Sequence, residues 1–295
     1  MNITIKKAED GLVLRFFLKE ILRLSHRTLA SVKRKERGIL LNGTPVTVRA
    51  VLHEGDVLSL SLLDTEKEAH SSVLPVALPV HILYEDEYVT VCAKPPFMPT
   101  HPSHRHRDDT LANALAYHYR GTPYVFRAVN RLDRETDGVV LTAKSAFAAA
   151  ALGRALREGE IQKIYYAIAV GITPAEGEIN APIRRQAESI ILRETASEGE
   201  YALTRYTRLA TVEGHSLLRV EPITGRTHQI RVHLSSIGHP LAGDGLYGGD
   251  ALLSRVALHA HSLSFPHPQT GKRVTVCAPP PDDFLRVFPT LPDLL

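Results

Sequence analysis

Residues 130–143 read NRLDRETDGVVLTA, a turn crowded with charges that runs directly into an apolar strand. The carboxylate of Asp133 stands between the guanidinium groups of Arg131 and Arg134, and nearby cations favour the charged form of a carboxyl group. Such a carboxylate can attack the anomeric carbon of a sugar and form a covalent intermediate, as in retaining glycosidases. The same pattern also describes a surface turn with weak ion pairs. Both interpretations are open for this stretch alone.

The composition describes an ordinary globular chain without a disulfide framework. It has 295 residues, 44% hydrophobic and 23% charged, which is enough for one large domain and a small one. Its two cysteines, Cys92 and Cys277, fit a reducing compartment. No apolar run reaches the length of a membrane span, and the N-terminal stretch MNITIKKAED lacks the apolar centre of a signal peptide. We therefore expect a cytoplasmic protein.

The basic charge is concentrated near the N-terminus. Residues 1–62 hold eleven Lys and Arg against six Asp and Glu, whereas the other 233 residues hold twenty-four against twenty-six. A basic segment attached to a nearly neutral one is suited to anchoring a polyanion such as a nucleic acid. The alternative is a solvated basic face with no partner.

The N-terminal segment predicts a small mixed unit. Residues 12–22 have apolar side chains at helical spacing, and Ser25 can cap a second, strongly basic helix that Gly38 ends. ILLNGTPVTV then predicts a hairpin around Asn42-Gly43, and EGDVLSLSL predicts a further strand. Phosphates are natural partners of such a basic helix, because binding them releases counterions.

These residues resemble a known RNA-binding module. The pattern LSHRTLASVKRKERGILLNGTPV, followed by LHEGDVLSL, is similar to the module named after ribosomal protein S4 over about residues 10–62, although His26 separates a serine and an arginine that are adjacent in the module. The resemblance implies a small α/β domain at residues 1–62 that presents basic side chains to structured RNA. A linker with mixed charge, Ser and Pro follows at residues 63–80. The candidate RNA contacts are Arg27, Lys33, Arg34 and Lys35.

The remainder, residues 81–295, predicts an α+β domain. Strand patterns such as HILYEDEYVTVCAK, IQKIYYAIAVG and YALTRYTRLATVEGHSLLRVEPI outnumber helical ones, and the two kinds do not alternate regularly. Helices are expected at DTLANALAYHYR, with Asp109 as the cap, at AFAAAALGRALREG, and from about Thr227. We expect a mixed, largely antiparallel sheet with flanking helices, not a doubly wound parallel sheet.

Two further stretches combine polar and aromatic residues suited to a nucleotide site. In KIYYA, Tyr165 and Tyr166 point to opposite faces of a strand, so one can enter a cleft while the other packs. In GRTHQIRVHLSSIG, one helical face packs and the other carries Arg231 outward, where it can pair with a carboxylate. Two packed tyrosines and an ordinary amphipathic helix are the alternatives when each stretch is taken alone.

Together, in this order, the three stretches resemble one enzyme family. NRLDRETDG, KIYYA and GRTHQIRVH with GHPLAGDGLYG are similar to pseudouridine synthases of the large-subunit ribosomal RNA type, the RluA family, and so are ILYEDEYVTVCAKPPFMPTHPS and LHAHSLSFPHPQTGK. The resemblance covers about residues 80–280. It implies the pseudouridine synthase fold and the isomerisation of uridine in structured RNA to its C-glycoside, with large-subunit ribosomal RNA as the expected target and a monomer as the expected state.

The resemblance also implies roles for individual residues. Asp133 is the expected catalytic carboxylate, Tyr165 lines the uracil site, and Arg231 pairs with Asp133. Arg131 helps to fill the gap left by the extruded nucleotide, and Arg226 and His228 of the GRTHQIR stretch are further candidate RNA contacts. Direct attack of Asp133 on C1′ and a route through a glycal both remain open.

The implied reaction uses no cofactor and no metal. Three histidines cluster in the loop HPSHRH, namely His101, His104 and His106. They lack a framework of cysteines or carboxylates at the spacing of a zinc site. We expect this loop to contact RNA or to have no ligand.

Two departures from the family pattern keep other functions open. Asn130 stands where the family usually has His, and Asp137 stands where it usually has Ser. If Asp137 lies near Asp133, its charge would raise the pKa of Asp133 and oppose Arg231. The alternative is therefore a non-catalytic RNA-binding or ribosome-assembly protein on the same scaffold. A glycoside hydrolase or nucleosidase is a third hypothesis, but an acid partner for Asp133 is not evident.

Overall fold

A computed structural model describes residues 1–64, 72–189 and 191–291. The N-terminal segment forms a four-stranded antiparallel sheet in the order β1 (Asn2–Thr4), β4 (Val57–Leu60), β2 (Ile39–Leu41), β3 (Thr44–Pro45). Its helices are a 3-10 turn (Lys7–Glu9), α1 (Leu14–Phe16) continuing into a π-helical turn (Phe17–Ile21), and α2 (His26–Arg34). Of the linker expected at 63–80, residues 65–71 lie outside the described residues.

A local sequence signal defines the start of α2, whereas the expectation that Gly38 ends it was wrong, because the helix already ends at Arg34. The Ser25 side chain accepts a hydrogen bond from the Thr28 backbone N–H at 3.1 Å, which caps the first turn as expected. After the helix, Gly38 passes so close to it that a Cβ there would lie 1.8 Å from the Val32 carbonyl oxygen. A side chain at this position would force the strand that follows away from the helix.

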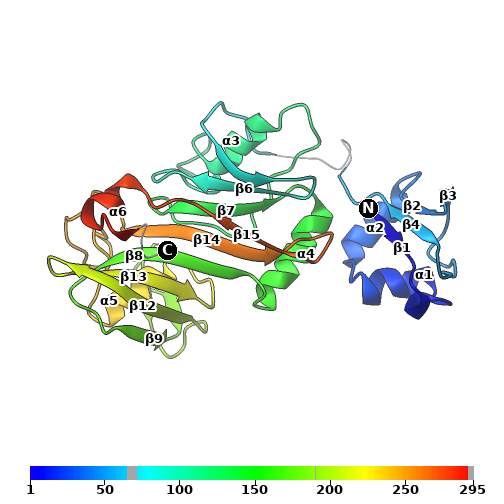
Figure 1. The fold of residues 1–295 in the computed structure, drawn as a ribbon. Helices are drawn as coiled ribbons and strands as arrows, with labels where there is room; N and C mark the ends of the chain where they lie inside the picture. Colours follow the sequence, from blue (N-terminus) through cyan, green and yellow to red (C-terminus); the bar gives the residue numbers. More distant parts are fainter. Residues whose placement is uncertain (65–71, 190, 292–295) are drawn as a thin grey trace.

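The larger part is built on one mixed sheet (Figure 1). Its strand order is β5, β6, β7, β14, β8, β13, β12, β9, with β15 also pairing with β14. All pairs are antiparallel except β7 with β14, so the expectation of a mixed, largely antiparallel α+β sheet is confirmed. The strands are β5 (His81–Glu85), β6 (Val89–Lys94), β7 (Asp137–Ala143), β8 (Gln162–Val170), β9 (Glu176–Asn180), β12 (Leu203–Val212), β13 (His215–Pro222), β14 (Leu258–Pro266) and β15 (Arg273–Cys277).

Strand β7 lies inside this sheet and begins directly after the charged turn. Every residue of β7 is buried, which explains its unbroken apolar run VVLTA. Gly138 has φ +112°, and a Cβ there would lie 2.2 Å from the Ala260 carbonyl oxygen on β14. Only glycine permits this approach of two backbones. The turn that carries Asp133 is therefore anchored at the centre of the sheet.

Among the described residues, four helices and a hairpin complete the larger part. They are α3 (Leu111–His118), α4 (Ala146–Arg157), α5 (Gln229–Ser236), α6 (Asp282–Val287), and β10 (Ile183–Arg185) paired with β11 (Arg193–Thr195). The expected cap Asp109 was wrong: Thr110 caps α3 by a reciprocal interaction with Asn113, while Asp109 contacts His106 at 2.6 Å. Helix α5 begins two residues later than expected, because His228 adopts a left-handed conformation with φ 56°.

The N-terminal unit lies beside the end of α4, to the right in Figure 1. The Arg154 side chain on α4 donates a hydrogen bond to the Arg23 carbonyl at 2.9 Å, and Arg23 lies 3.9 Å from Glu158. None of the described helices is long and apolar enough to cross a membrane.

Candidate active site

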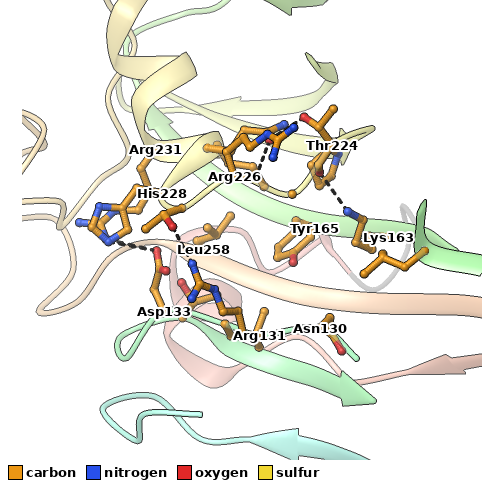
Figure 2. A pocket seen from close by; sticks show the side chains of 18 of the residues that line it. Asn130, Arg131, Asp133, Lys163, Tyr165, Thr224, Arg226, His228, Arg231 and Leu258 are labelled. Carbon is orange, nitrogen blue, oxygen red and sulfur yellow. Dashed lines mark hydrogen bonds and ion pairs between the residues drawn. The ribbon is translucent and has the colours of Figure 1, made fainter. Parts of the chain in front are cut away.

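A cavity of about 290 Å³ opens where the charged turn, β8 and the segment 222–231 meet. It lies near the lower end of the usual range of small-molecule sites, about 300–1,000 Å³. Asp133, Tyr165 and Arg231 all line it, as do Arg131, Arg226 and His228 (Figure 2). The structure thus brings together six candidate residues from three separate stretches of the sequence.

Arg231 is buried and is shared between two carboxylates. Its side chain is only 5% exposed, which corrects the expectation of an outward-facing arginine on α5. Nε and Nη2 donate to the two oxygens of Asp244 at 2.7 and 2.8 Å, and Nη1 donates to Oδ2 of Asp133 at 3.3 Å. Burial lowers the pKa of Arg231, but the hydrogen bond and charge of Asp244, with the charge of Asp133, outweigh it and raise the pKa. Asp244 thus fixes the guanidinium that meets Asp133.

Asp133 presents one oxygen to the protein and the other to the cavity. Oδ2 accepts the hydrogen bond from Nη1 of Arg231 and also lies 3.8 Å from Nε2 of His228. Oδ1 takes no hydrogen bond or ion pair from any described residue. The side chain is 28% exposed, so this second oxygen is open to a ligand.

Tyr165 forms the apolar floor beside Asp133. It lies on β8 and is 9% exposed, and burial together with the Asp133 charge raises its pKa, so it is a neutral phenol. Tyr166 points to the other face, where its ring centroid lies 4.7 Å from that of His261. The two tyrosines therefore divide between cavity and core, as strand alternation predicts.

Lys163 is a second ionisable group on the cavity face of β8. It stands two residues before Tyr165, so its side chain points to the same side. Its Nζ donates to the Thr224 carbonyl at 3.0 Å, and burial lowers its pKa to about 8. The expectation for KIYYA named only the tyrosines, although strand alternation places this lysine on the same face as Tyr165.

The other three candidate residues, Arg131, Arg226 and His228, also border the cavity. Arg131 donates to the Thr227 hydroxyl at 2.6 Å, which joins the charged turn to the segment before α5 across the opening. Arg226 lies 2.5 Å from Glu200 and donates to the Tyr201 carbonyl at 3.0 Å. His228 approaches the Tyr247 hydroxyl at 2.8 Å through Nδ1.

Asp137 and Asn130, the two residues that depart from the family pattern, each bond to other parts of the structure. Oδ1 of Asp137 accepts a hydrogen bond from Nη1 of Arg255, and Oδ2 lies at hydrogen-bond distance from Nδ1 of His259, both at 3.0 Å. The negative charge of Asp137 thus has a cationic partner of its own in Arg255. Burial raises the pKa of Asp137, but the hydrogen bond and charge of His259 and the charge of Arg255 outweigh it and lower the pKa. Asn130 bonds the β7 backbone: its side chain donates to the Val139 carbonyl and accepts from the Leu141 N–H.

The basic residues of the N-terminal unit lie apart from this cavity. Arg27, Lys33 and Arg34 are exposed on or beside α2. Lys35 is half-buried, and its Nζ donates to the Ser61 and Leu63 carbonyls at 3.0 and 2.5 Å. Its charge is thus partly used within the unit. No group of three or more His, Cys, Asp and Glu within the described ranges is arranged to hold a metal ion.

Comparison with known proteins identifies one family. The model of RNA pseudouridylate synthase matches residues 88–236. The chain is 38% identical to the uncharacterised RNA pseudouridine synthase YjbO of Bacillus subtilis, over 90% of this chain and 95% of that protein. It is 37% identical to ribosomal large subunit pseudouridine synthase D of Pseudomonas aeruginosa, over 85% of this chain and 83% of that protein.

A solved structure agrees with these sequence relatives. Human RNA pseudouridylate synthase domain containing 1 superposes with a TM-score of 0.59 at 29% identity, over 74% of this chain and 86% of that one. A second human structure, RNA pseudouridylate synthase domain containing 4, has a TM-score of 0.58 at 24% identity over 72% of this chain and 93% of that one, and supports the fold.

Proposed function

The chain belongs to the RNA pseudouridine synthase family, whose members are isomerases, and from this premise we propose that it converts uridine to pseudouridine in large-subunit ribosomal RNA, with Asp133 as the catalytic carboxylate. The reaction breaks the N1–C1′ bond, turns the uracil within the site and joins C5 to C1′. The C5 proton is lost and N1 regains one, so the product is an isomer of the substrate. The ribosomal target is supported by relatives named for the large subunit.

The single observation that carries the proposal is the open oxygen of Asp133 in the cavity. Arg231 holds Oδ2, whereas Oδ1 has no partner among the described residues. A carboxylate that is already oriented needs little reorganisation when charge develops on the ribose. The same placement serves direct attack on C1′ and the glycal route.

The rest of the cavity suits a nucleotide that has left its helix. Extruding a base from a paired helix costs a few kcal/mol. Stacking of the uracil on Tyr165 offsets part of this cost, and Arg131, once released from Thr227, can occupy the vacated position in the RNA. The raised pKa of Tyr165 keeps its ring neutral beside the base.

We propose that residues 1–62 are an S4-like RNA-binding domain and residues 81–295 the catalytic domain. The four-stranded sheet with α2 and the exposed Arg27, Lys33 and Arg34 support this division. Phosphate contacts of this kind give affinity with little sequence preference. The N-terminal domain would thus hold structured RNA while the cavity selects the uridine.

The test is pseudouridine formation by Asp133→Asn. We expect loss of all detectable turnover on a ribosomal RNA fragment, with RNA affinity within about threefold of the unchanged protein. Asp108→Asn, which changes an exposed carboxylate outside the cavity, is the matched control and should leave turnover intact. Turnover by Asp133→Asn would contradict the assignment.

Two further readouts separate the alternatives. Pseudouridine mapping across total RNA, with and without the gene, should show at least one position that disappears. If Asp133→Asn restores a deletion strain fully, the non-catalytic RNA-binding hypothesis is favoured. Release of free uracil would instead indicate a nucleosidase.

A further inference from the structure

His228 occupies an unusual position between Asp133 and Tyr247. Its backbone adopts the left-handed region, φ 56°, which non-glycine residues rarely adopt, immediately before α5. The side chain is 11% exposed, with Nε2 facing Asp133 and Nδ1 facing the Tyr247 hydroxyl. A backbone held in a sparsely populated region beside a reactive group points to a function for the side chain.

Tyr247 restricts the proton on Nδ1. Its hydroxyl oxygen already accepts the Arg193 backbone N–H at 3.0 Å. Nδ1 of His228 lies 2.8 Å from this hydroxyl, and an unprotonated Nδ1 lets the phenol donate its proton there while its oxygen keeps the bond from Arg193. In neutral imidazole this leaves the hydrogen on Nε2.

Asp133, which faces Nε2 of His228, favours the same tautomer. An ionised carboxylate only accepts hydrogen bonds. A lone pair on Nε2 would repel Oδ2, whereas an N–H there is attracted to it across the 3.8 Å separation. Both neighbours of the ring therefore select the Nε2–H tautomer.

We propose that His228 is a positioning residue, held by Tyr247 as an Nε2–H donor, which together with Arg231 fixes Oδ2 of Asp133 and so leaves Oδ1 to meet the substrate. This rests on the proposed function of Asp133. It assigns the reacting oxygen, and it makes His228 a donor within the protein instead of an RNA contact. A neutral imidazole of this tautomer offers no lone pair to the cavity, so His228 does not act as the base.

The charges around the ring agree with a neutral histidine. Burial lowers the pKa of His228, the charges of Asp133 and Asp244 raise it, and those of Arg231 and Arg193 lower it, with the lowering effects in excess. Tyr247, the remaining titratable neighbour, has its own pKa raised by burial and stays a neutral donor. An uncharged His228 supports Asp133 without neutralising it.

The experiment compares three variants in the full-length protein. His228→Gln keeps an N–H donor near the Nε2 position and should retain kcat within about fivefold. His228→Leu removes the N–H dipole that faces Oδ2 of Asp133 at 3.8 Å, at similar volume, and should lower kcat on the order of tenfold, while the Kd for RNA changes less than threefold. Tyr247→Phe should lower kcat by roughly three- to tenfold, because the tautomer is no longer selected.

A spectroscopic readout tests the tautomer independently of turnover. In a long-range ¹H–¹⁵N spectrum of the unsubstituted protein, the His228 signals are those missing from His228→Gln. We expect an unprotonated Nδ1 and a protonated Nε2, and a mixture of tautomers in Tyr247→Phe. An Nδ1–H tautomer in the unsubstituted protein would overturn the proposal.

The kinetic outcomes separate this proposal from the proposed function. If Asp133→Asn is inactive but His228→Leu keeps full kcat, Asp133 is catalytic and the positioning role is wrong. If His228→Leu weakens RNA binding as much as it lowers kcat, His228 is an RNA contact. If Asp133→Asn is itself active, the assignment of Asp133 as the catalytic carboxylate fails, and with it the role of His228 in positioning that carboxylate.

Discussion

Two clusters of nearly identical composition stand at the two ends of the turn 133–137. In one, Arg231 joins Asp133 to Asp244, with His228 beside Asp133. In the other, Arg255 joins Asp137 to Asp283, with His259 beside Asp137. Both contain an arginine between two aspartates and one histidine, yet only the first lines the cavity of about 290 Å³. Residue type alone does not distinguish the carboxylate that we propose as catalytic, Asp133, from Asp137.

The difference lies in how completely each aspartate is satisfied. Both oxygens of Asp137 have a partner at 3.0 Å, and its side chain is 10% exposed. Asp133 is 28% exposed, its contacts at 3.3 and 3.8 Å are longer, and both fall on Oδ2. The closed cluster stabilises the sheet, whereas the open cluster keeps one oxygen for a ligand.

The largest effects should come from replacing each arginine by lysine. Arg231→Lys cannot reach both aspartates, because lysine lacks the planar fork, and should lower kcat by at least about 100-fold. Arg255→Lys should lower the free energy of unfolding by about 3 kcal/mol and leave kcat of the folded protein within threefold. Urea unfolding and single-turnover kinetics measure both. Equal losses of kcat in the two variants would remove the distinction between the clusters.

Asp137→Asn tests the closed cluster by pH. Asn leaves the buried Arg255 with only Asp283 as a carboxylate partner among the described residues and weakens its bond to position 137, which should cost about 2 kcal/mol of stability at pH 7. The folded-state pKa of Asp137 lies below its ordinary value of 3.8. The stability that the carboxylate contributes is therefore fully present above pH 3.8 and is lost as pH falls through the folded-state pKa. The stabilities of the two proteins should therefore converge as pH falls through the folded-state pKa of Asp137. A difference that is constant with pH would contradict this account.

Two buried lysines, Lys94 and Lys163, should respond in opposite directions to replacement by methionine. Lys94, beside Asp137, donates to three carbonyls, at Pro95, Met98 and Arg134, so Lys94→Met orphans them and should cost about 2 kcal/mol. Lys163 donates to one, so Lys163→Met mainly removes a buried charge and should stabilise the fold by about 1–3 kcal/mol at pH 7.

The pH dependence of stability checks the Lys163 prediction. Its pKa is about 8 in the folded state against 10.5 when unfolded, so the unfolded chain binds more protons between these values. The free energy of unfolding of the unsubstituted protein should rise through this window, relative to Lys163→Met. Parallel curves for the two proteins would mean that Lys163 is not a buried ammonium.

The smallest effect is expected at Asn130. Its side chain bonds two backbone groups of β7 and does not touch either cluster through a described contact. Asn130→Ala should lower stability by about 1–2 kcal/mol with kcat within twofold. A large fall in kcat would contradict this purely structural role and would mean that Asn130 acts on the open cluster directly.

Several parts of the fold and site followed from local pattern. Alternation in β8 separates Tyr165 from Tyr166, and the apolar run after the charged turn predicts the buried β7. Asp244 and Tyr247 lie within the quoted stretch GHPLAGDGLYG, but nothing in their spacing shows that they hold Arg231 and His228. The left-handed backbone of His228 was missed because a helical pattern continues through it in the sequence.

The sequence by itself determined the class of fold, the family and the identity of Asp133, Tyr165 and Arg231 as candidates, since these depend on periodicity and on motif residues close together in the chain. The tertiary structure decided which aspartate has an open oxygen. Arg231 lies 98 residues from Asp133 and Arg255 lies 118 residues from Asp137, and only sheet pairing and helix packing bring these partners together. Burial and the number of donors around a carboxylate are properties of the packed molecule, not of its neighbours along the chain.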